Sequence, residues 1–576
     1  MGNILARRMI PAIVLLATVV FAFPIARSEE ETDDPILKGL TGELDRSASR
    51  LVMKDFEKPY FISYRLTDVK SMSVRGSYGA LETAGGDSYR GVAVDVRVGD
   101  YKEDNTSDDE GFYYDPHDDD AYVFARAYAP VDNDITAMRQ KLWLLTDYQY
   151  KRALEDYIGK RGRSIQKVTQ EDQPEDFSKI EPVKRLDPID SLKVDRKRWE
   201  NLVRAISARF KAQPLIYNST VDFKAISQAR YLVTTEGTRV RTGQHNYSMA
   251  ISADVRAEDG MPLELERVFK SHHYGELPDS SGLVLATDSL IDLLLALREA
   301  PVMEPYTGPA IIKSGASGVF FHEGLGHRLE GHRMRRDSEG HTFKDKVGSR
   351  IIPDFLSVYD DPTADKVGKT ELYGEYDFDE EGVPAQRVSL VERGILKGFL
   401  MGRTPIKTHK VSNGHGRADI WSQPVSRMGS LFVTSDAPVS YAALRKQLVD
   451  ECRKAGKDYG LIFEEMVSGE TNTASAGVQT LKVRPRVVRK LFVKDGHEEL
   501  VRGVELIGTP LNLLENIKAA GDDPGVFNGV CGAESGWVPV SAVAPSVLIR
   551  EVEVQKMDRN LKRPPILPPP LHDPAK

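Results

Sequence analysis

The sequence has few cysteines, no long basic run and no long apolar run outside its N-terminus, and each of these absences argues against a class of protein. Two cysteines, Cys452 and Cys531, in 576 residues are too few for a scaffold built on disulfides. A formal net charge of −8 disfavours binding to nucleic-acid phosphates, so no nucleic-acid partner is expected. Hydrophobic residues at 40% and charged residues at 28% are typical of a soluble globular chain.

The first 28 residues have the pattern of an export signal. Two arginines precede the apolar run Met9–Phe23, and Ala26-Arg27-Ser28 has the small-x-small form that a signal peptidase accepts. The alternative is an uncleaved anchor helix, but the run is shorter than the ~20 apolar residues that a span needs, and Pro24 follows it. We therefore predict a signal peptide over residues 1–28, no stable membrane span after its cleavage, and an exported protein, periplasmic or secreted.

Hydrophobic periodicity predicts both helices and strands. Strands are expected where valines alternate within Arg90–Tyr101, and hairpins around Glu236-Gly237, around Asp259-Gly260 and within Arg484–Gly508. A dense run of acidic residues at 102–120 lacks the regular spacing of a calcium loop and predicts a solvated insertion. Apolar residues recur at helical spacing in four segments: Asp132–Ile158, Asp195–Ala212, Leu283–Ala300 and Ser440–Gly456.

The length exceeds one ordinary core, so two large domains are expected. The boundary is placed in the proline-bearing segment Pro301–Pro309, after which turn signals recur in a β-rich region. The fold class is therefore α+β. We predict an N-terminal α/β domain over residues 29–304, a β-rich C-terminal domain over 305–560, and a Pro-rich tail over 561–576.

The stretch "FFHEGLGHRLEGHRM", residues 320–334, resembles a zinc-protease helix with one residue too many. His322 and His327 are five positions apart, so an undistorted α-helix would point them about 140° apart. A π-type turn closes over five residues, and Gly324 and Gly326 tolerate irregular backbone. The motif therefore predicts two metal ligands joined by a π-type turn, with Glu323 placed to accept a proton from the attacking water.

The spacing alone leaves a metal site and a polar helix end as alternatives. The preceding "SGASGVFF" is small and apolar and predicts burial, and buried ionisable groups need a partner or a metal. A zinc site needs a third protein ligand. A Cys452–Cys531 disulfide is the alternative use of the cysteines in an exported protein. The candidates for the third ligand are Glu330, His332, His341, His415 and Cys531.

The segment from Pro305 to Glu553 resembles the TldD/PmbA family of zinc metallopeptidases. The resemblance rests, in order, on "PYTGPAIIKSGASGVFFHEGLGHRLEG", "DEEGVPAQRVSLVERGILKGFLMGR", "NGHGRA" and "NGVCGAESGWVPVSAVAPSVLIREVEV". The N-terminal half is similar only in outline. The sequence departs from the family pattern in two places. It has an export signal, and a Ser-Gly-Trp sequence ending at Trp537 stands where the family has Gly-Gln. Both departures bear on the substrate and the partner rather than on the chemistry.

The resemblance implies a Zn²⁺ ion held by His322, His327 and Cys531, with Glu323 as general base. It implies the metal-bearing, TldD-like branch and an N-terminal α/β domain joined to a β-rich domain that carries the metal site. It also implies dimers around an enclosed cavity, formed by two copies or with a family paralogue. Unstructured peptides are the implied substrates, bound as extended strands.

The resulting prediction is a zinc-dependent metallopeptidase that hydrolyses peptide bonds in unfolded or flexible peptides. The alternative is a non-catalytic peptide-binding or partner subunit with structural zinc. An intact Glu323 argues against it, since a closed structural site needs no base. Arg328 and Glu330 follow the motif and are candidates to orient the ligands, with a surface role as the alternative. His415, in "NGHGRA", is a candidate to support the site, although a tight glycine turn explains that motif nearly as well.

Overall fold

The computed structural model describes residues 34–106, 127–164, 173–476, 479–557, 562 and 565–572. The predicted signal peptide, residues 1–28, and most of the acidic insertion at 102–120 lie outside these residues. The described part combines helices with many strands, which confirms the α+β prediction. Short 3-10 helices occur at η1 (Ala208–Ala212), η2 (Tyr274–Glu276) and η5 (Pro570–His572).

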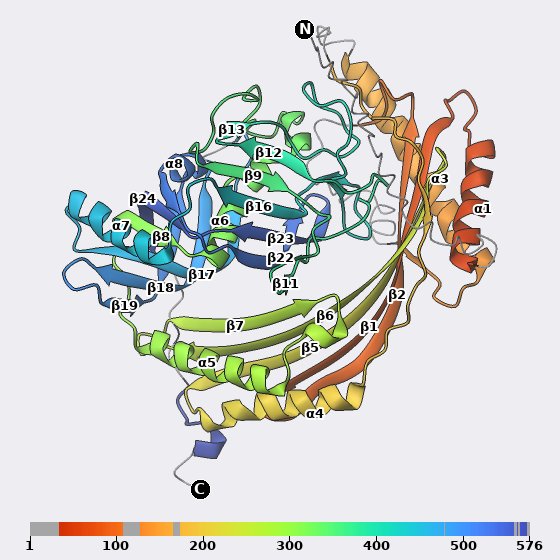
Figure 1. Cartoon of the computed structure of the whole chain (residues 1–576). Helices are drawn as coiled ribbons and strands as arrows, with labels where there is room; N and C mark the ends of the chain where they lie inside the picture. Colours follow the sequence, from red (N-terminus) through yellow and green to blue (C-terminus); the bar gives the residue numbers. More distant parts are fainter. Residues whose placement is uncertain are drawn as a thin grey trace, which may run out of the picture.

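One long curved sheet dominates the N-terminal half (Figure 1). Its order is β3-β2-β1-β5-β6-β4, with β7 also paired to β6. Among these described strands only β4 and β6 pair in parallel. The strands are β1 (Pro59–Ser77), β2 (Ala80–Val98), β3 (Ala127–Ala129), β4 (Lys184–Leu186), β5 (Ile216–Thr234), β6 (Arg239–Arg256) and β7 (Pro262–Ser271).

The sheet is built from the predicted hairpins, but its strands extend further than the sequence pattern indicated. β5 and β6 turn at Gly237, with φ +107°, and β6 and β7 turn at Gly260, with φ +87°. Both angles lie in the left-handed region that favours glycine. Along β5, Val221, Phe223 and Ala225 are buried at every second position, as one face of a strand requires.

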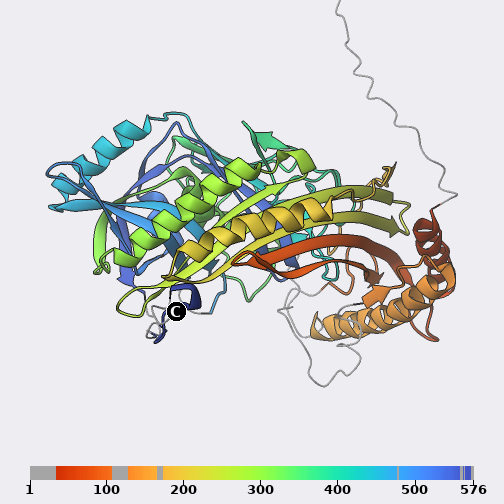
Figure 2. The same ribbon diagram turned by 90° about the horizontal axis from the view of Figure 1, so that it is seen from below.

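Four helices cover the convex face of this sheet (Figures 1 and 2). α1 (Pro35–Arg50) and α3 (Ile135–Ser164) share one core with β1 and β2, and α4 (Arg196–Ser207) and α5 (Ser280–Glu299) share another with β5 and β6. The predicted helices in these regions are confirmed. By length and composition alone α5 could span a membrane, but Leu283, Leu290 and Leu294 on its inner face are buried in the second core.

Five strands of the C-terminal half close into a ring. β17 pairs with β8 and β18, β20 pairs with β18 and β24, and β24 returns to β8. β19 extends the ring at β18, and β21 at β24. We call this ring the barrel. The strands of the ring are β8 (Tyr306–Ile312), β17 (Tyr459–Thr471), β18 (Leu481–Phe492), β20 (Val504–Gly508) and β24 (Val547–Lys556), and the two extensions are β19 (Glu498–Val501) and β21 (Ile517–Ala520).

Helix α7 (Tyr441–Lys454) confirms the predicted helix and covers β8 and β17 from outside; α8 (Pro510–Glu515) lies beside β24. Cys452, on the inner face of α7, is buried against Ile311 and Ile462. Both cysteines are free thiols, so the alternative of a Cys452–Cys531 disulfide is wrong. The two residues lie in separate cores, Cys452 between α7 and the barrel and Cys531 beside Val538 and Val540.

A second sheet lies against the barrel, with the order β13-β12-β9-β16-β23-β22. β22 is therefore an edge strand of this sheet. Two small hairpins, β10 with β11 and β14 with β15, complete the described strands. The bounds are β9 (Leu356–Asp360), β10 (Lys366–Val367), β11 (Thr370–Glu371), β12 (Val388–Glu392), β13 (Ile395–Leu396), β14 (Gly416–Arg417), β15 (Val425–Ser426), β16 (Ser430–Ser435), β22 (Gly525–Ala533) and β23 (Gly536–Ala544).

The concave face of the long sheet is turned toward the C-terminal half (Figure 1). Ion pairs join the two: Arg403 with Glu236 at 2.7 Å, and Arg267 with Glu465 at 3.0 Å. The C-terminal barrel begins at β8, close to the predicted boundary at Pro301–Pro309. The two halves are therefore packed against each other across this boundary. The predicted division into residues 1–28, 29–304, 305–560 and 561–576 stays a prediction.

Candidate metal centre

Helix α6 (Ser314–Gly324) carries the first histidine of the motif into the interior. It begins directly after β8 and packs against β17, β22 and β23. Gly318 permits this close approach, because a Cβ there would lie 2.9 Å from the Ala542 carbonyl oxygen. The residues before the motif are buried, as predicted, and His322 in the last turn is 4% exposed.

The backbone between the two histidines differs from the predicted π-type turn. α6 ends at Gly324, Leu325 has φ −121° and ψ −49°, and the 3-10 helix η3 (Gly326–Leu329) follows at once. Gly324 is a poor helix residue. A Cβ at Gly326 would lie 2.1 Å from Met428 Sδ, so the turn is fitted to a glycine. This change of helix type places the rings of His322 and His327 with centroids 4.9 Å apart.

Cys531 reaches the two histidines from the edge strand β22. Its Sγ lies 3.4 Å from His327 Nε2, and one ligand atom from each of the three residues lies within 4.8 Å of the others. A tetrahedral zinc, with Zn–S ~2.3 Å and Zn–N ~2.05 Å, separates sulfur from nitrogen by about 3.6 Å. The three side chains are buried and their spacing fits one shared metal ion.

The second nitrogen of His327 is held by a buried carboxylate. Glu330 Oε2 lies 3.1 Å from His327 Nδ1 and 2.9 Å from Arg333 Nε. Burial alone would raise the pKa of Glu330, but His327 and Arg333 outweigh it and lower that pKa to about 2. An ionised Glu330 accepts a hydrogen bond from Nδ1–H, and Nε2 is the nitrogen that faces Cys531. Carboxylates commonly orient metal-bound imidazoles in this way.

The donor set is electrostatically suited to a cation. Burial would raise the pKa of the Cys531 thiol, but His327 and His322 lower it to about 4. Burial would lower the pKa of His327, but Glu330 and Cys531 raise it to about 10. The protein alone therefore holds a thiolate beside an imidazolium, and a metal cation would displace the His327 proton. Among the described residues, His322 Nδ1 is buried with no hydrogen-bond partner, so protein groups alone do not satisfy the cluster.

Glu323 lies at the edge of the cluster, with Oε2 3.9 Å from His327 Nε2. Its side chain is 13% exposed, so it is largely enclosed yet reachable. Burial raises its pKa, partly opposed by His327 and His322. Gly469 of β17 forms the wall behind it, since a Cβ there would lie 2.5 Å from Glu323 Cγ. A carboxylate with a raised pKa next to ligand groups can accept a proton and return it.

Arg328 fastens the end of α6 to β17. Its Nη1 donates to the Glu323 carbonyl oxygen at 3.1 Å and to Thr471 Oγ1 at 2.8 Å, and its Nη2 donates to the Asn472 carbonyl oxygen at 3.2 Å. Arg328 is 2% exposed, so a surface role is wrong for this side chain. It supports the backbone that carries Glu323 rather than the ligand atoms themselves.

Arg427 was missed by the sequence analysis. Its Nη2 donates to the Cys531 carbonyl oxygen at 2.8 Å, and its Nε lies 3.5 Å from Glu330 Oε1. It thus links the cysteine strand to the carboxylate behind His327. No local signal marks it, because "PVSRMG" carries neither a motif nor a periodicity that predicts a fully buried guanidinium.

The remaining candidate ligands lie elsewhere. His332 pairs with Glu534, and His341 Nε2 lies 2.8 Å from the Arg336 carbonyl oxygen. His415 is fully buried, with Nε2 3.2 Å from Asp360 Oδ1 and Nδ1 2.9 Å from the Asn413 carbonyl oxygen. In the described part of the chain, none of the three joins the His322, His327 and Cys531 cluster.

Comparison with known proteins finds relatives of the C-terminal half. Residues 305–556 match the family described as PmbA/TldA metallopeptidase C-terminal domain. A protein of Archaeoglobus fulgidus named "Metalloprotease" is 29% identical over 244 residues, 42% of this chain and 51% of that protein. A "Zinc metalloprotease TldD homolog" of Saccharolobus solfataricus is 23% identical over 249 residues, 43% of this chain and 51% of that protein. The chain therefore spans about half the length of these curated relatives.

The fold is similar over a longer stretch. The crystal structure of TldE from Thermococcus kodakarensis matches with a TM-score of 0.56 and 14% identity, covering 86% of this chain and 97% of that one. At this identity the likeness concerns the fold alone. Through this match and the named relatives, residues 305–556 of the chain belong to the TldD/PmbA family.

Proposed function

We propose that this chain is a zinc-dependent metallopeptidase that hydrolyses peptide bonds in unfolded or flexible peptides. The observation that carries the proposal is the buried cluster of His322, His327 and Cys531 with Glu323 beside it. The names of the relatives, metalloprotease and zinc metalloprotease, support it. Since the alignments span about half of those proteins, the activity, the substrate and the partner are all part of the proposal.

In this proposal His322, His327 and Cys531 hold the metal, and Glu330 and Arg427 hold His327 and Cys531 in place. A bound zinc ion would supply Lewis acidity toward the scissile carbonyl and toward water. The thiolate of Cys531 donates more charge to a metal than a third imidazole would. We therefore expect slow turnover on generic peptides.

Glu323 is the proposed general base and acid. It takes a proton from the water whose oxygen forms the new bond to the carbonyl carbon. It then gives that proton to the amine nitrogen as the carbon–nitrogen bond breaks. Burial raises the pKa of Glu323. At neutral pH its carboxylate therefore takes up a proton more readily than an exposed glutamate does. Arg328 keeps the Glu323 backbone at this position.

The edge strand β22 favours an extended substrate. Edge strands offer unpaired backbone groups to another chain, and peptides commonly bind by adding a strand. β22 pairs with β23 on one side only in the described sheet, and its Val530 is 47% exposed. A peptide paired with β22 would run alongside Cys531. Only a chain without its own fold can adopt this extended form, which is why flexible peptides are the proposed substrates.

Two further parts of the proposal concern location and assembly. The pattern of residues 1–28 supports export to the periplasm or the medium. The family match of residues 305–556 is the ground for proposing assembly with a second family subunit, either another copy of this chain or a paralogue.

The test compares the wild-type chain with Glu323→Gln and with Glu499→Gln, a matched change on β19 where the side chain is 41% exposed. Zinc per chain and cleavage of an unstructured peptide are measured for each. We expect about one zinc in all three proteins and loss of cleavage in Glu323→Gln alone. Retained cleavage in Glu323→Gln removes it from the mechanism. Zinc without cleavage in any of the three favours a partner subunit with structural zinc.

A further inference from the structure

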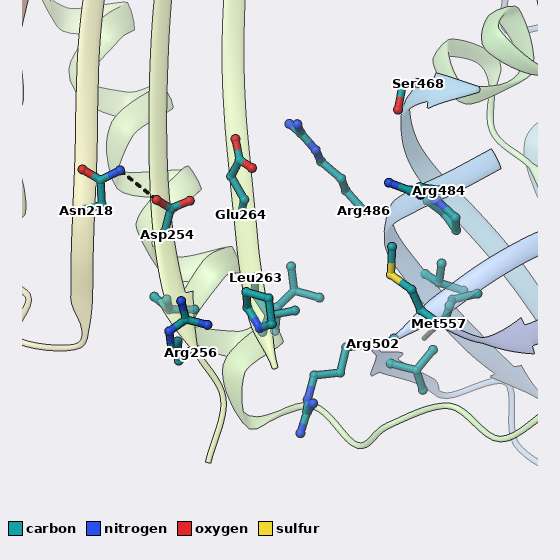
Figure 3. A pocket seen from close by; sticks show the side chains of 18 of the residues that line it. Asn218, Asp254, Arg256, Leu263, Glu264, Ser468, Arg484, Arg486, Arg502 and Met557 are labelled. Carbon is teal, nitrogen blue, oxygen red and sulfur yellow. Dashed lines mark hydrogen bonds between the residues drawn. The ribbon is translucent and has the colours of Figure 1, made fainter. Parts of the chain in front are cut away.

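A cavity of about 570 Å³ lies between the N-terminal sheet and the barrel (Figure 3). One wall comes from β5, β6 and β7, and the other from β17, β18 and β20. No residue of the metal centre lines it. Ser468 of β17 lines the cavity, whereas its neighbour Gly469 faces Glu323. Successive residues of a strand face opposite sides, so the cavity and the metal centre lie on opposite faces of β17.

The barrel wall of this cavity carries guanidinium groups that are only loosely paired. Arg484 has its nearest printed carboxylate, Glu505, at 3.7 Å, and Arg486 has Glu266 at 4.0 Å. Figure 3 shows both side chains reaching from β18 into the space before the opposite wall. Arg502 differs, because its Nη1 lies 2.8 Å from Asp259 Oδ2.

The sheet wall adds one more cation and two carboxylates. Arg256 of β6 lines the cavity and forms no ion pair with any described residue. Asp254 already accepts a hydrogen bond from Asn218 at 2.9 Å, and Glu264 stands across from Arg486 in Figure 3. Arg502 is held by Asp259, whereas Arg484 and Arg486 have their carboxylate partners at 3.7 and 4.0 Å and Arg256 has none in the described part of the chain, so three guanidinium groups can turn to a ligand.

We propose that this cavity binds a small ligand with two or more carboxylate groups, held between Arg256 on the sheet wall and Arg484 and Arg486 on the barrel wall. Guanidinium groups match carboxylates in a two-pronged geometry, and loosely paired ones are free to make it. The volume lies in the range of sites for small organic ligands. Asp254 and Glu264 oppose a long polyanion, because its further charges would meet their carboxylates. The inference does not depend on the peptidase activity.

The first test measures binding of a tri-glutamate peptide to the full chain by titration calorimetry. Arg256→Gln and Arg484→Gln, from opposite walls, are each expected to raise the Kd about tenfold or more, since each removes a charged hydrogen-bond donor. The control is Arg489→Gln, on the same strand as Arg484 but paired with Glu464 at 3.0 Å and outside the cavity lining. It is expected to leave the Kd unchanged. Wild-type binding should also weaken as salt rises.

Two comparison ligands decide the chemistry. Tri-lysine is expected not to bind, and inorganic pyrophosphate is expected to bind more weakly than tri-glutamate. Saturable binding of tri-glutamate that only the two cavity variants weaken supports the proposal. An unchanged Kd in both cavity variants overturns it, as does the absence of tri-glutamate binding to the wild-type chain. Tighter binding of pyrophosphate than of tri-glutamate overturns the assignment to carboxylates. Because Arg484 is 61% exposed, its replacement leaves the core intact.

Discussion

The carboxylate of Glu330 should be needed both for folding and for metal binding, and Glu330→Gln tests the two roles together. Glu330 is fully buried and contacts His327, Arg333 and Arg427. The amide of glutamine keeps the shape but removes the negative charge. Three nitrogen-bearing groups would then remain in the interior without the anion that compensates them.

The magnitude follows from the pKa. The pKa of Glu330 falls from 4.5 to about 2, which corresponds to roughly 3 kcal/mol of folding free energy. Because the folded pKa is depressed, this contribution is present above pH 4.5 and is lost as the pH falls toward 2. Breaking a buried ion pair by removing one partner costs about 3–5 kcal/mol, which agrees. Losing the acceptor behind a ligating histidine should also weaken metal binding by about 10- to 100-fold.

The assays are urea unfolding at pH 7 and competition for zinc with a chelator. Glu339→Gln is the matched control, since Glu339 Oε1 lies 2.6 Å from Arg333 Nη1 but does not contact His327. It should lower stability by less than Glu330→Gln and leave zinc affinity unchanged. If Glu330→Gln unfolds at the wild-type urea concentration and holds zinc equally well, the reasoning from the buried carboxylate is refuted.

Three further predictions concern the same centre. Cys531→Ala should lower zinc content measured by atomic absorption, and unchanged zinc would mean another third ligand. Gly326→Ala should cost about 1–3 kcal/mol in urea unfolding, because the new Cβ would press on Met428 Sδ; an unaltered midpoint would contradict the tight fit. In the metal-free chain the carboxyl pKa of Glu323, followed by NMR titration, should lie above the ordinary glutamate value of 4.5, because burial raises it; a pKa at or below 4.5 would contradict that effect of burial.

Local patterns in the sequence predicted local structure well. The helices at α3, α4, α5 and α7 follow from apolar spacing, and the turns at Gly237 and Gly260 follow from the need for positive φ. The π-type turn was wrong because spacing fixes only how far apart two histidines are. It cannot report that Met428, more than a hundred residues away, requires a glycine where the 3-10 helix begins.

Contacts between distant segments were predicted less well. His415 shares its motif with glycines that suggested a site, yet its partners are Asp360 and Asn413. Arg427 has no motif at all, yet it contacts both Glu330 and the Cys531 carbonyl oxygen. Such roles depend on which strands meet, and that depends on the order of the sheet rather than on any short stretch of sequence.

In the proposed function, the position of β22 would let one strand serve both the metal and the substrate. Cys531 projects from it toward His322 of α6 and His327 of η3, and Val538 and Val540 of β23 pack beside the cysteine. The opposite, outer edge of β22 has no neighbouring strand in the described sheet. A strand in the middle of the sheet could supply the cysteine but would have no backbone edge to offer a peptide. A free loop could meet a peptide but would not hold the sulfur 3.4 Å from His327 Nε2. An edge strand meets both requirements.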